Sequence, residues 1–151
     1  MTTTIERLLA YEAWANQRIL ATVQAMPPQA AERACTLLGH VASGLRVWHQ
    51  RVAGVEQTAG PWDVLTLEQC AAALLEQQDA WTELLRQETD IDRVIKYRSM
   101  AGDPFETPLK DILWHLSFHS HYHRGQVNAA IRAAGCTPVN VDFIAFQREG
   151  H

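Results

Sequence analysis

The sequence shows no excess of positive charge. Its 13 lysine and arginine residues are outnumbered by 17 aspartate and glutamate residues, and the formal net charge is −4 at pH 7. Because nucleic-acid-binding proteins normally carry a basic cluster or stripe, the composition argues against DNA, RNA and anionic membranes as partners. The sequence also lacks an uninterrupted apolar run of roughly 18 residues, the length that a membrane-spanning helix requires.

Cysteine is scarce as well. The three cysteines, Cys35, Cys70 and Cys136, are odd in number and far apart, and this spacing predicts neither a disulfide framework nor a thiolate metal site. The segment from Met1 to Glu6 lacks the basic start and apolar run of a secretory signal. We therefore expect a cytoplasmic protein with reduced, mostly buried cysteines.

The length of 151 residues, with 47% hydrophobic residues, suffices for a single domain, residues 1–151, with a sizeable core. Four long segments have the apolar periodicity of helices, and they cover residues 4–25, 34–53, 66–88 and 107–135. A short irregular or hairpin insert at residues 94–105 precedes the last helix, and the apolar tail at 137–146 is expected to pack on the bundle. These features predict an all-α protein, an antiparallel four-helix bundle.

Proline and glycine mark several predicted helix ends. Met26-Pro27-Pro28 ends the first helix, since proline cannot continue a helix and restrains the residue before it. Thr107 is the predicted N-cap of the fourth helix, with Pro108 in its first turn. Gly135 is the predicted residue just after the end of that helix.

Histidine is the unusual component, since four of the seven histidines fall between His115 and His123. On a helix with alternating spacings of three and four, one inward stripe contains Leu109, Ile112, Leu116, His119, His123, Gln126 and Ala130. His119 and His123 are four residues apart, so both rings leave the same face and can converge on one ion. Burying polar groups without partners costs roughly 1–3 kcal/mol each, a cost that a shared metal ion removes. Hydrogen bonding alone is the alternative, and spacing does not decide between the two.

A third ligand is expected from the second helix, which carries His40 and His49. The two histidines are about 2.5 turns apart and point to opposite sides. His40 lies on the inward row with Gly44, whose missing side chain leaves space beside the ring. We therefore predict a metal site formed by His40 together with His119 and His123.

Other polar residues are predicted near this site. His115 either forms a rival ligand pair with His119 or flanks the pocket. Glu12 and Asn16 share the inward face of the first helix. In a functional role they hold ligand rings or contact substrate; the alternative is that they reach water at a bundle end. Arg124 either orients an anionic substrate or forms a salt bridge, and we favour the salt bridge. Gln126 is expected to hold a ligand ring or a bound water.

Three further expectations concern residues around the pocket. His121 is predicted to face solvent. A glycine in a helix interior, such as Gly125, lowers the stability of the helix by about 1 kcal/mol relative to alanine. We therefore expect that close backbone packing explains this glycine. Trp48 and Trp114 are predicted to wall the pocket.

The segment from His115 to Gln126 resembles the fourth-helix motif of the DinB/YfiT-like metal-binding proteins, in which H-x-x-x-H-R-G-Q carries two ligands. His40, followed by Trp48 and Arg51, resembles their second-helix motif, whose leading histidine is the third ligand. The segments 11–16 and 138–146 are similar to their first helix and closing segment. The resemblance covers nearly the whole chain, and the fourth-helix motif is its most specific part.

The resemblance implies an up-down-down-up four-helix bundle, often a homodimer, with one divalent metal ion on three histidines. Zinc or nickel is expected first, and iron or manganese next, because neutral imidazole suits several transition metals. It also implies a small-molecule substrate, a low-molecular-weight thiol, in a transferase or isomerase reaction. A metal-dependent hydrolase and a non-catalytic metal-binding stress-response module are the alternatives.

The number of ligands bears on these alternatives. Three protein ligands leave coordination positions for water or substrate, which is typical of catalytic metal sites. The sequence lacks the H-E-x-x-H motif of zinc proteases. It also lacks the Glu-x-x-His pair of di-metal bundles, so a single metal ion is expected.

Overall fold

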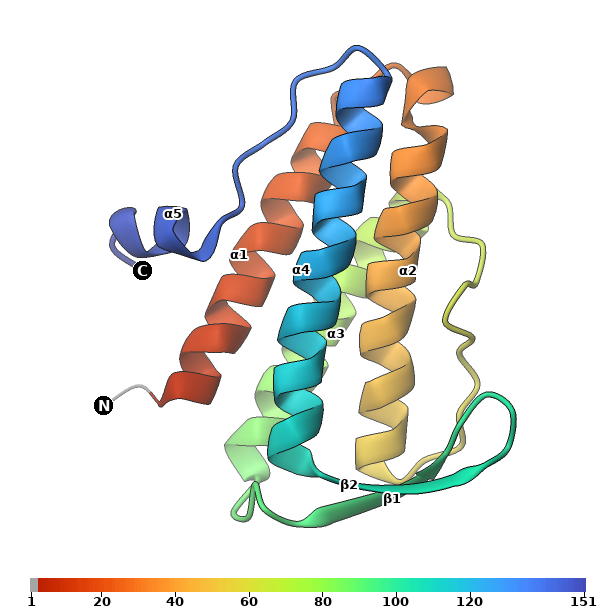
Figure 1. The fold of residues 1–151 in the computed structure, drawn as a ribbon, viewed down its shortest axis with the longest axis vertical. Coiled ribbons are helices and arrows are strands. Elements are labelled where there is room, and N and C mark those ends of the chain that lie inside the picture. The colour runs from red at the N-terminus through yellow and green to blue at the C-terminus, as the bar shows by residue number, and fades with distance from the viewer. Residues whose placement is uncertain (1–2) are drawn as a thin grey trace.

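A computed structural model describes residues 3–151. Four long helices form a bundle, completed by a two-stranded hairpin and a short C-terminal helix (Figure 1). In chain order the elements are α1 (Thr4–Gln24), α2 (Pro28–Ala53), α3 (Leu67–Gln87), β1 (Val94–Arg98), β2 (Pro104–Pro108), α4 (Leu109–Ala133) and α5 (Phe143–Arg148). The predicted four-helix bundle is confirmed. Across the described residues, none of the helices is both long and apolar enough to span a membrane.

The helices follow the up-down-down-up order. In Figure 1, α1 and α4 run towards one end of the bundle, and α2 and α3 run towards the other. Since α2 and α3 point the same way, the connection at residues 54–66 has to return along the full length of α2. This crossover places a loop over the outer side of α2, where it contacts the candidate site described below.

The proline pair both ends α1 and begins α2. α1 stops at Gln24, as the sequence predicts, but α2 begins at Pro28 and not at residue 34. Proline is well tolerated in the first turn of a helix, where its missing N–H has no intrahelical partner in any case. The residues before 34 therefore extend the helix by almost two turns, including the buried Ala31.

The start of α4 also differs from the prediction. Thr107 lies in β2 and its hydroxyl pairs with the hydroxyl of Tyr97 at 3.1 Å, so Thr107 is not the N-cap. The first N–H groups of α4 instead bond to backbone carbonyls: Leu109 N donates to Arg93 O, and Lys110 N donates to Ile91 O. The loop before the hairpin thus satisfies the unpaired donors of the helix start.

The predicted hairpin is confirmed. β1 and β2 pair antiparallel, with Tyr97 opposite Phe105, and the turn contains Gly102 at φ 91°, a conformation that favours glycine. The hairpin closes one end of the bundle and buries Ile95 against it. Gly135, at φ 79°, follows the end of α4 as predicted.

The C-terminal tail packs against α1, as expected from its apolar residues. Phe146 of α5 is buried, and the ring of Tyr11 lies 5.8 Å from its ring. The Tyr11 hydroxyl donates to the backbone carbonyl of Val141 at 2.8 Å. These contacts fix the outer side of α1 and leave the α2–α4 side of the bundle for the histidines.

Candidate metal centre

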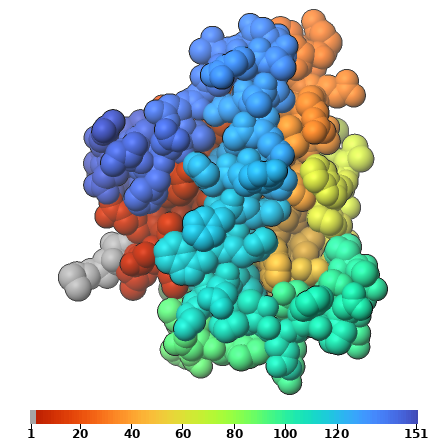
Figure 2. Space-filling model, viewed as in Figure 1, coloured from red at the N-terminus to blue at the C-terminus, as the bar shows by residue number. Residues whose placement is uncertain are grey.

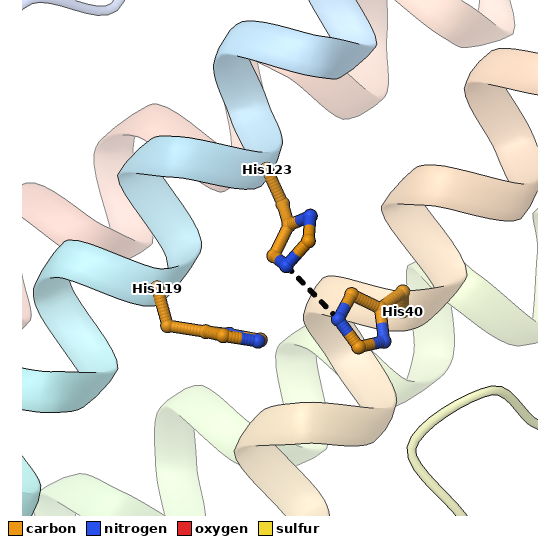
Figure 3. Close-up of side chains that lie close together, drawn as sticks. All are labelled: His40, His119 and His123. Atoms are coloured by element: carbon orange, nitrogen blue, oxygen red, sulfur yellow. Dashed lines mark hydrogen bonds between the residues drawn. The ribbon is translucent and has the colours of Figure 1, made fainter.

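Three histidines meet between α2 and α4. His40 comes from the middle of α2, and His119 and His123 come from adjacent turns of α4 (Figure 3). One ring nitrogen from each lies within 4.8 Å of the other two. His40 is buried, and the two α4 histidines are half-buried. The structure therefore brings together the three residues that the sequence predicts as ligands.

The rotation of α4 differs from the predicted stripe. The buried face of α4 is centred on residues such as Ser120, Val127 and Ile131, which the stripe did not include. His119 and His123 lie at the border between this core and the solvent, facing α2. The histidines are thus placed at the edge of the core and not on its central seam, which leaves their rings accessible from outside.

A glycine on α2 makes room for one of the rings. A Cβ added to Gly44 would lie 3.1 Å from Cε1 of His119 and 3.6 Å from its Nδ1. Such a contact is too short for an unshifted ring. The space that the sequence predicts beside Gly44 exists, and the imidazole of His119 fills it.

Oxygen acceptors fix the orientation of the other two rings. The Nδ1–H of His40 donates to the backbone carbonyl of Pro61 at 2.6 Å. The Nδ1 of His123 lies 2.7 Å from Oε1 of Gln126, to which it donates. Both protons are therefore on Nδ1, and both Nε2 atoms carry lone pairs. Gln126 holds the ring of His123, one of the three candidate ligands.

The two Nε2 atoms face each other 3.0 Å apart. With Nδ1 protonated on both rings, a hydrogen bond between the Nε2 atoms requires a second proton and an imidazolium. A metal ion accepts both lone pairs with the rings neutral. Nitrogen ligands of a tetrahedral ion at 2.0–2.1 Å are about 3.3 Å apart, close to the separation observed here.

Electrostatics also favour neutral rings. Burial, together with the neighbouring histidines, lowers the pKa of His119 to about 4. Burial likewise lowers the pKa of His40. Because a metal ion binds the neutral imidazole, the site fits a divalent transition metal.

An aromatic side chain, Trp62, stacks on the ring of His40. The indole of Trp62 stacks on the imidazole with ring centroids 3.7 Å apart and planes 7° from parallel, and it also meets His123 edge-on at 6.2 Å. Trp62 and Pro61 belong to the crossover between α2 and α3, and sequence reasoning missed both. The only local signal was a tryptophan in the polar and glycine-containing segment 54–64.

The other three histidines of the long helices lie outside the triad. His115 is exposed, with its ring 5.3 Å from His119 and 5.3 Å from Trp48, so it flanks the site. His121 faces solvent as predicted, and its Nδ1 lies 3.0 Å from the Tyr11 hydroxyl. His49 packs edge-on against Trp81.

Two expectations about residues around the pocket, Trp114 and Gly125, are wrong. Trp114 does not wall the site: it is 41% exposed on the outer face of α4, where it stacks on Phe118. Gly125 is exposed, and within the described chain nothing lies within 4 Å of a Cβ placed there. Close packing inside the monomer therefore does not explain this glycine.

Two polar residues of α1, Glu12 and Asn16, accept hydrogen bonds from Arg124. Its guanidinium, with 0% side-chain exposure, donates two hydrogen bonds to Glu12 at 2.9 and 3.0 Å and one to Asn16 at 2.9 Å. Glu12 and Asn16 are therefore neither partners of the ligand rings nor water-facing residues. Arg124 forms the salt bridge that the sequence favours, because consecutive residues of a helix point in different directions and Arg124 faces α1 while His123 faces α2.

The fold and the site define a helical-bundle protein with an accessible three-histidine constellation suited to a metal ion. Comparison with known proteins identifies the family: the DinB family model matches residues 1–150, and the chain belongs to this family. Protein DinB of Bacillus subtilis (strain 168) is similar, with 21% identity over 154 residues, 91% of this chain and 90% of that protein. A DinB-like protein from Bacillus cereus ATCC 10987 has the same fold, with a TM-score of 0.71, 20% identity and coverage of 93% of this chain and 99% of that chain.

Proposed function

We propose that this protein binds one divalent transition metal ion through His40, His119 and His123, and that it transfers a low-molecular-weight thiol to an electrophilic small molecule. The supporting observation is the pair of Nε2 atoms of His40 and His123, 3.0 Å apart, with both Nδ1 atoms engaged by oxygen acceptors. Two lone pairs directed at one point form a ligand set, and the low pKa of His119 keeps a third imidazole neutral beside them.

Zinc or nickel is the first expectation for the ion, with iron or manganese next. A divalent ion on three protein ligands supplies an open coordination position and lowers the pKa of a thiol held there. In the reaction, the thiol sulfur forms a bond to the electrophilic carbon, and the leaving group departs with the electron pair of the broken bond. His115 is the proposed acceptor of the thiol proton, since it is exposed and its ring lies 5.3 Å from the ring of His119.

The aromatic rings around the triad suit a small substrate with an apolar part. Trp62 covers one side of His40, and the ring of Tyr122 meets His123 at 5.1 Å. Both residues are more than half exposed, at 54% and 65%, so a substrate can cover them. Binding there excludes water from the side of the triad that faces solvent.

We further propose that the protein acts in the cytoplasm as a homodimer, without nucleic-acid or membrane partners. All three cysteines are free, which fits a reducing compartment. The formal net charge of −4 gives no basic surface for a polyanion.

The metal site is tested by elemental analysis of the purified, untagged protein beside His123→Ala. The expected result is about one transition-metal ion per chain in the parent and loss of most of it in the variant. His121→Ala is the matched control, since it removes an exposed histidine from the same helix between the two ligands. A parent that contains no metal and takes up neither zinc, nickel, iron nor manganese contradicts the proposal.

The reaction is tested with metal-loaded and metal-free protein, a low-molecular-weight thiol and an aryl halide as electrophile. Thioether formation that requires the metal, and that falls in His115→Gln without loss of metal, supports the transferase. Turnover of activated esters alone identifies a hydrolase instead. If chelation lowers the melting temperature strongly and no substrate is turned over, the ion stabilises the fold and the protein is a non-catalytic binding module.

A further inference from the structure

A long, narrow pocket, the α1–α3 pocket, enters the bundle between α1 and α3. Its lining residues on α1 run from Ile5 to Gln17, twelve positions apart, which at 1.5 Å per residue is about 18 Å along the helix. The empty space between its walls is about 620 Å³ with the open mouth included, but only about 40 Å³ of it is wide enough for the centre of a water molecule. The pocket therefore suits a slender chain and not a bulky ring system.

This pocket is separate from the candidate metal centre. The metal centre lies between α2 and α4, whereas α3 lies behind α4 in Figure 1, and Figure 2 shows α4 covering the middle of that front face. Among the described residues that line the α1–α3 pocket there is no histidine. Leu45 and Leu116, both buried, line it from α2 and α4, so the pocket reaches the core of the bundle from the other side.

Most of the pocket wall is apolar. α1 contributes Leu8 and Leu9, and α3 contributes Leu74 and Trp81. The indole N–H of Trp81 donates to the backbone carbonyl of Leu45 at 3.1 Å, so this polar group of the ring is already paired. A wall of leucine side chains and an indole ring binds alkyl groups through the burial of apolar surface.

One buried polar atom in this wall lacks a partner. The side chain of Gln77 lines the pocket and is 2% exposed, and its Oε1 accepts no hydrogen bond from the described residues. Buried polar atoms are almost always hydrogen-bonded, because an unpaired one has lost its bond to water without a replacement. A donor on a molecule in the pocket would supply the missing bond. Gln77 therefore indicates a bound molecule that carries a polar group as well as an apolar one.

A second amide lines the same pocket. The Oδ1 of Asn16 accepts a hydrogen bond from Arg124 at 2.9 Å, which leaves the NH₂ group of this amide to donate to another partner. A hydroxyl group both donates and accepts hydrogen bonds. It therefore matches an amide oxygen on α3 and an amide NH₂ group on α1.

The charges around the pocket favour an uncharged molecule. Among the described residues that line it, Glu12 is the one ionisable side chain, and its two oxygens accept hydrogen bonds from Arg124 at 2.9 and 3.0 Å. Because this pair is balanced, a carboxylate or ammonium group buried beside it would meet no unpaired opposite charge. Burying such a group costs far more than burying a hydroxyl. The pocket therefore disfavours alkyl acids and alkyl amines, which are charged at neutral pH.

We propose that the α1–α3 pocket is a second binding site, which takes an uncharged alkyl alcohol. The hydroxyl of the alcohol donates to Oε1 of Gln77, and the alkyl chain lies along the apolar wall between α1 and α3. Three observations define this class of molecule: the length and narrowness of the pocket, the unpaired amide oxygen and the balanced charge. The site depends neither on the metal ion nor on the reaction proposed above.

The hydrogen bond is tested with octanol and with octyl methyl ether, which has the same chain and no donor. Isothermal titration calorimetry of the parent is expected to give octanol a dissociation constant about tenfold lower than that of the ether. Gln77→Leu removes the acceptor and should bind the two compounds equally. This variant should also melt no lower than the parent, because it no longer buries an unpaired oxygen.

Gln29→Leu, at an exposed glutamine of α2 outside the pocket, is the matched control and should keep the preference for octanol. A parent that binds octanol no tighter than the ether, or that binds neither, overturns the proposal. Octanoate and octylammonium are expected to bind at least about 100-fold more weakly than octanol. Equal affinity for either charged compound overturns the assignment to an uncharged molecule.

The position of the site is tested by NMR of the indole N–H groups. Octanol should shift the signal of Trp81, which lines the pocket, and leave unchanged that of Trp62, which stacks on His40. Ala13→Phe adds a ring at a half-buried position of the pocket wall, and it should abolish octanol binding while the metal content stays that of the parent. A shift at Trp62 alone, or full octanol affinity in Ala13→Phe, places the alcohol elsewhere and overturns the proposal. Neither result bears on metal binding by the histidines.

Discussion

Glu12 and Arg124 form a buried, doubly hydrogen-bonded ion pair between α1 and α4. The two carboxylate oxygens lie 2.9 and 3.0 Å from the guanidinium nitrogens, and the side chains are 8% and 0% exposed. Asn16 accepts a third hydrogen bond from the same group. Because His123 precedes Arg124 on α4, this pair anchors the turn of helix that carries His123, one of the candidate ligands.

Loss of one partner of this pair is expected to be costly. Arg124→Met leaves the Glu12 carboxylate buried and unpaired, so the free energy of unfolding should fall by about 3–5 kcal/mol. The double variant Arg124→Met/Glu12→Leu removes the orphaned charge, and it should recover a large part of that loss. Urea unfolding in the presence of a chelator measures both, so that metal binding does not enter.

The exposed pair of Arg46 and Glu76 provides the control. Its side chains are 46% and 56% exposed, and Arg46→Met should change the free energy of unfolding by roughly 0–1 kcal/mol. If Arg124→Met proves as mild as Arg46→Met, the ion pair does not anchor α4 in solution.

Gln126 is expected to tune the metal site through the ring of His123. Its Oε1 accepts the Nδ1–H of His123 at 2.7 Å, which fixes the tautomer and leaves Nε2 free. Gln126→Leu removes this acceptor, and the zinc affinity should fall by about 10–100-fold. Gln126→Glu retains an acceptor and should keep the affinity. Competition with a chelating dye measures both constants.

Gln78→Leu is the matched control, at an exposed glutamine of α3. An affinity in Gln126→Leu equal to that of Gln78→Leu would mean that the hydrogen bond does not orient the ring. Since Gln126 is not itself one of the three proposed ligands, the metal stoichiometry should stay the same in every one of these variants.

The sequence predicted the helices and the triad because both depend on local geometry. The spacing of four between His119 and His123 places two rings on one face of any helix, and His40 follows from the direction that its position on α2 imposes. The bundle follows from apolar periodicity in the same way. These features need no knowledge of how the helices pack.

The parts that were missed depend on contacts between distant segments. Because of the rotation of α4 against α1, Glu12 and Asn16 contact Arg124 and not the ring of a candidate ligand. Because α3 runs in the same direction as α2, the connection at residues 54–66 passes His40, and Trp62 stacks on its ring. The first N–H groups of α4 donate to the carbonyls of residues 91 and 93. The sequence predicted a side-chain cap at this helix start because these backbone acceptors come from a loop whose position only the fold determines.

The buried thiol of Cys70 is expected to lower the free energy of unfolding at alkaline pH. Burial raises the pKa of its thiol from 9.0 to about 12, with a smaller effect from the neighbouring Cys35. Between those values the unfolded chain releases the thiol proton and the folded chain keeps it. The unfolded state then binds fewer protons, so the contribution of this thiol to the free energy of unfolding falls as pH rises from 9 to 12.

Comparison with Cys70→Ala isolates this contribution, because the other alkaline groups are common to both proteins. At pH 7 the parent should be more stable, since alanine leaves a cavity at a fully buried position. The difference should shrink steadily in urea unfolding experiments from pH 9 to 11. A constant difference across that range would mean that the thiol titrates alike in the folded and unfolded chains.

Gly44→Ala is expected to change metal affinity and stability in opposite directions. The added Cβ would lie 3.1 Å from Cε1 of His119, so the ring must move by a few tenths of an ångström away from its position beside His40. The zinc affinity should therefore fall roughly tenfold. The helix gains up to about 1 kcal/mol from the replacement of glycine by alanine, so the metal-free protein should be as stable as the parent or more stable.

Gly39→Ala on the same helix separates these effects. Its Cβ would meet the sulfur of Cys70 at 3.5 Å, an ordinary contact, so it shares the gain in helix propensity and should retain full zinc affinity. Titration with zinc and urea unfolding of the chelated proteins give both quantities for each variant. Because a general loss of folding lowers affinity and stability together, only displacement of the His119 ring explains weaker zinc binding by an equally stable protein. Unchanged zinc affinity in Gly44→Ala would mean that His119 is not held at the position where it binds the ion.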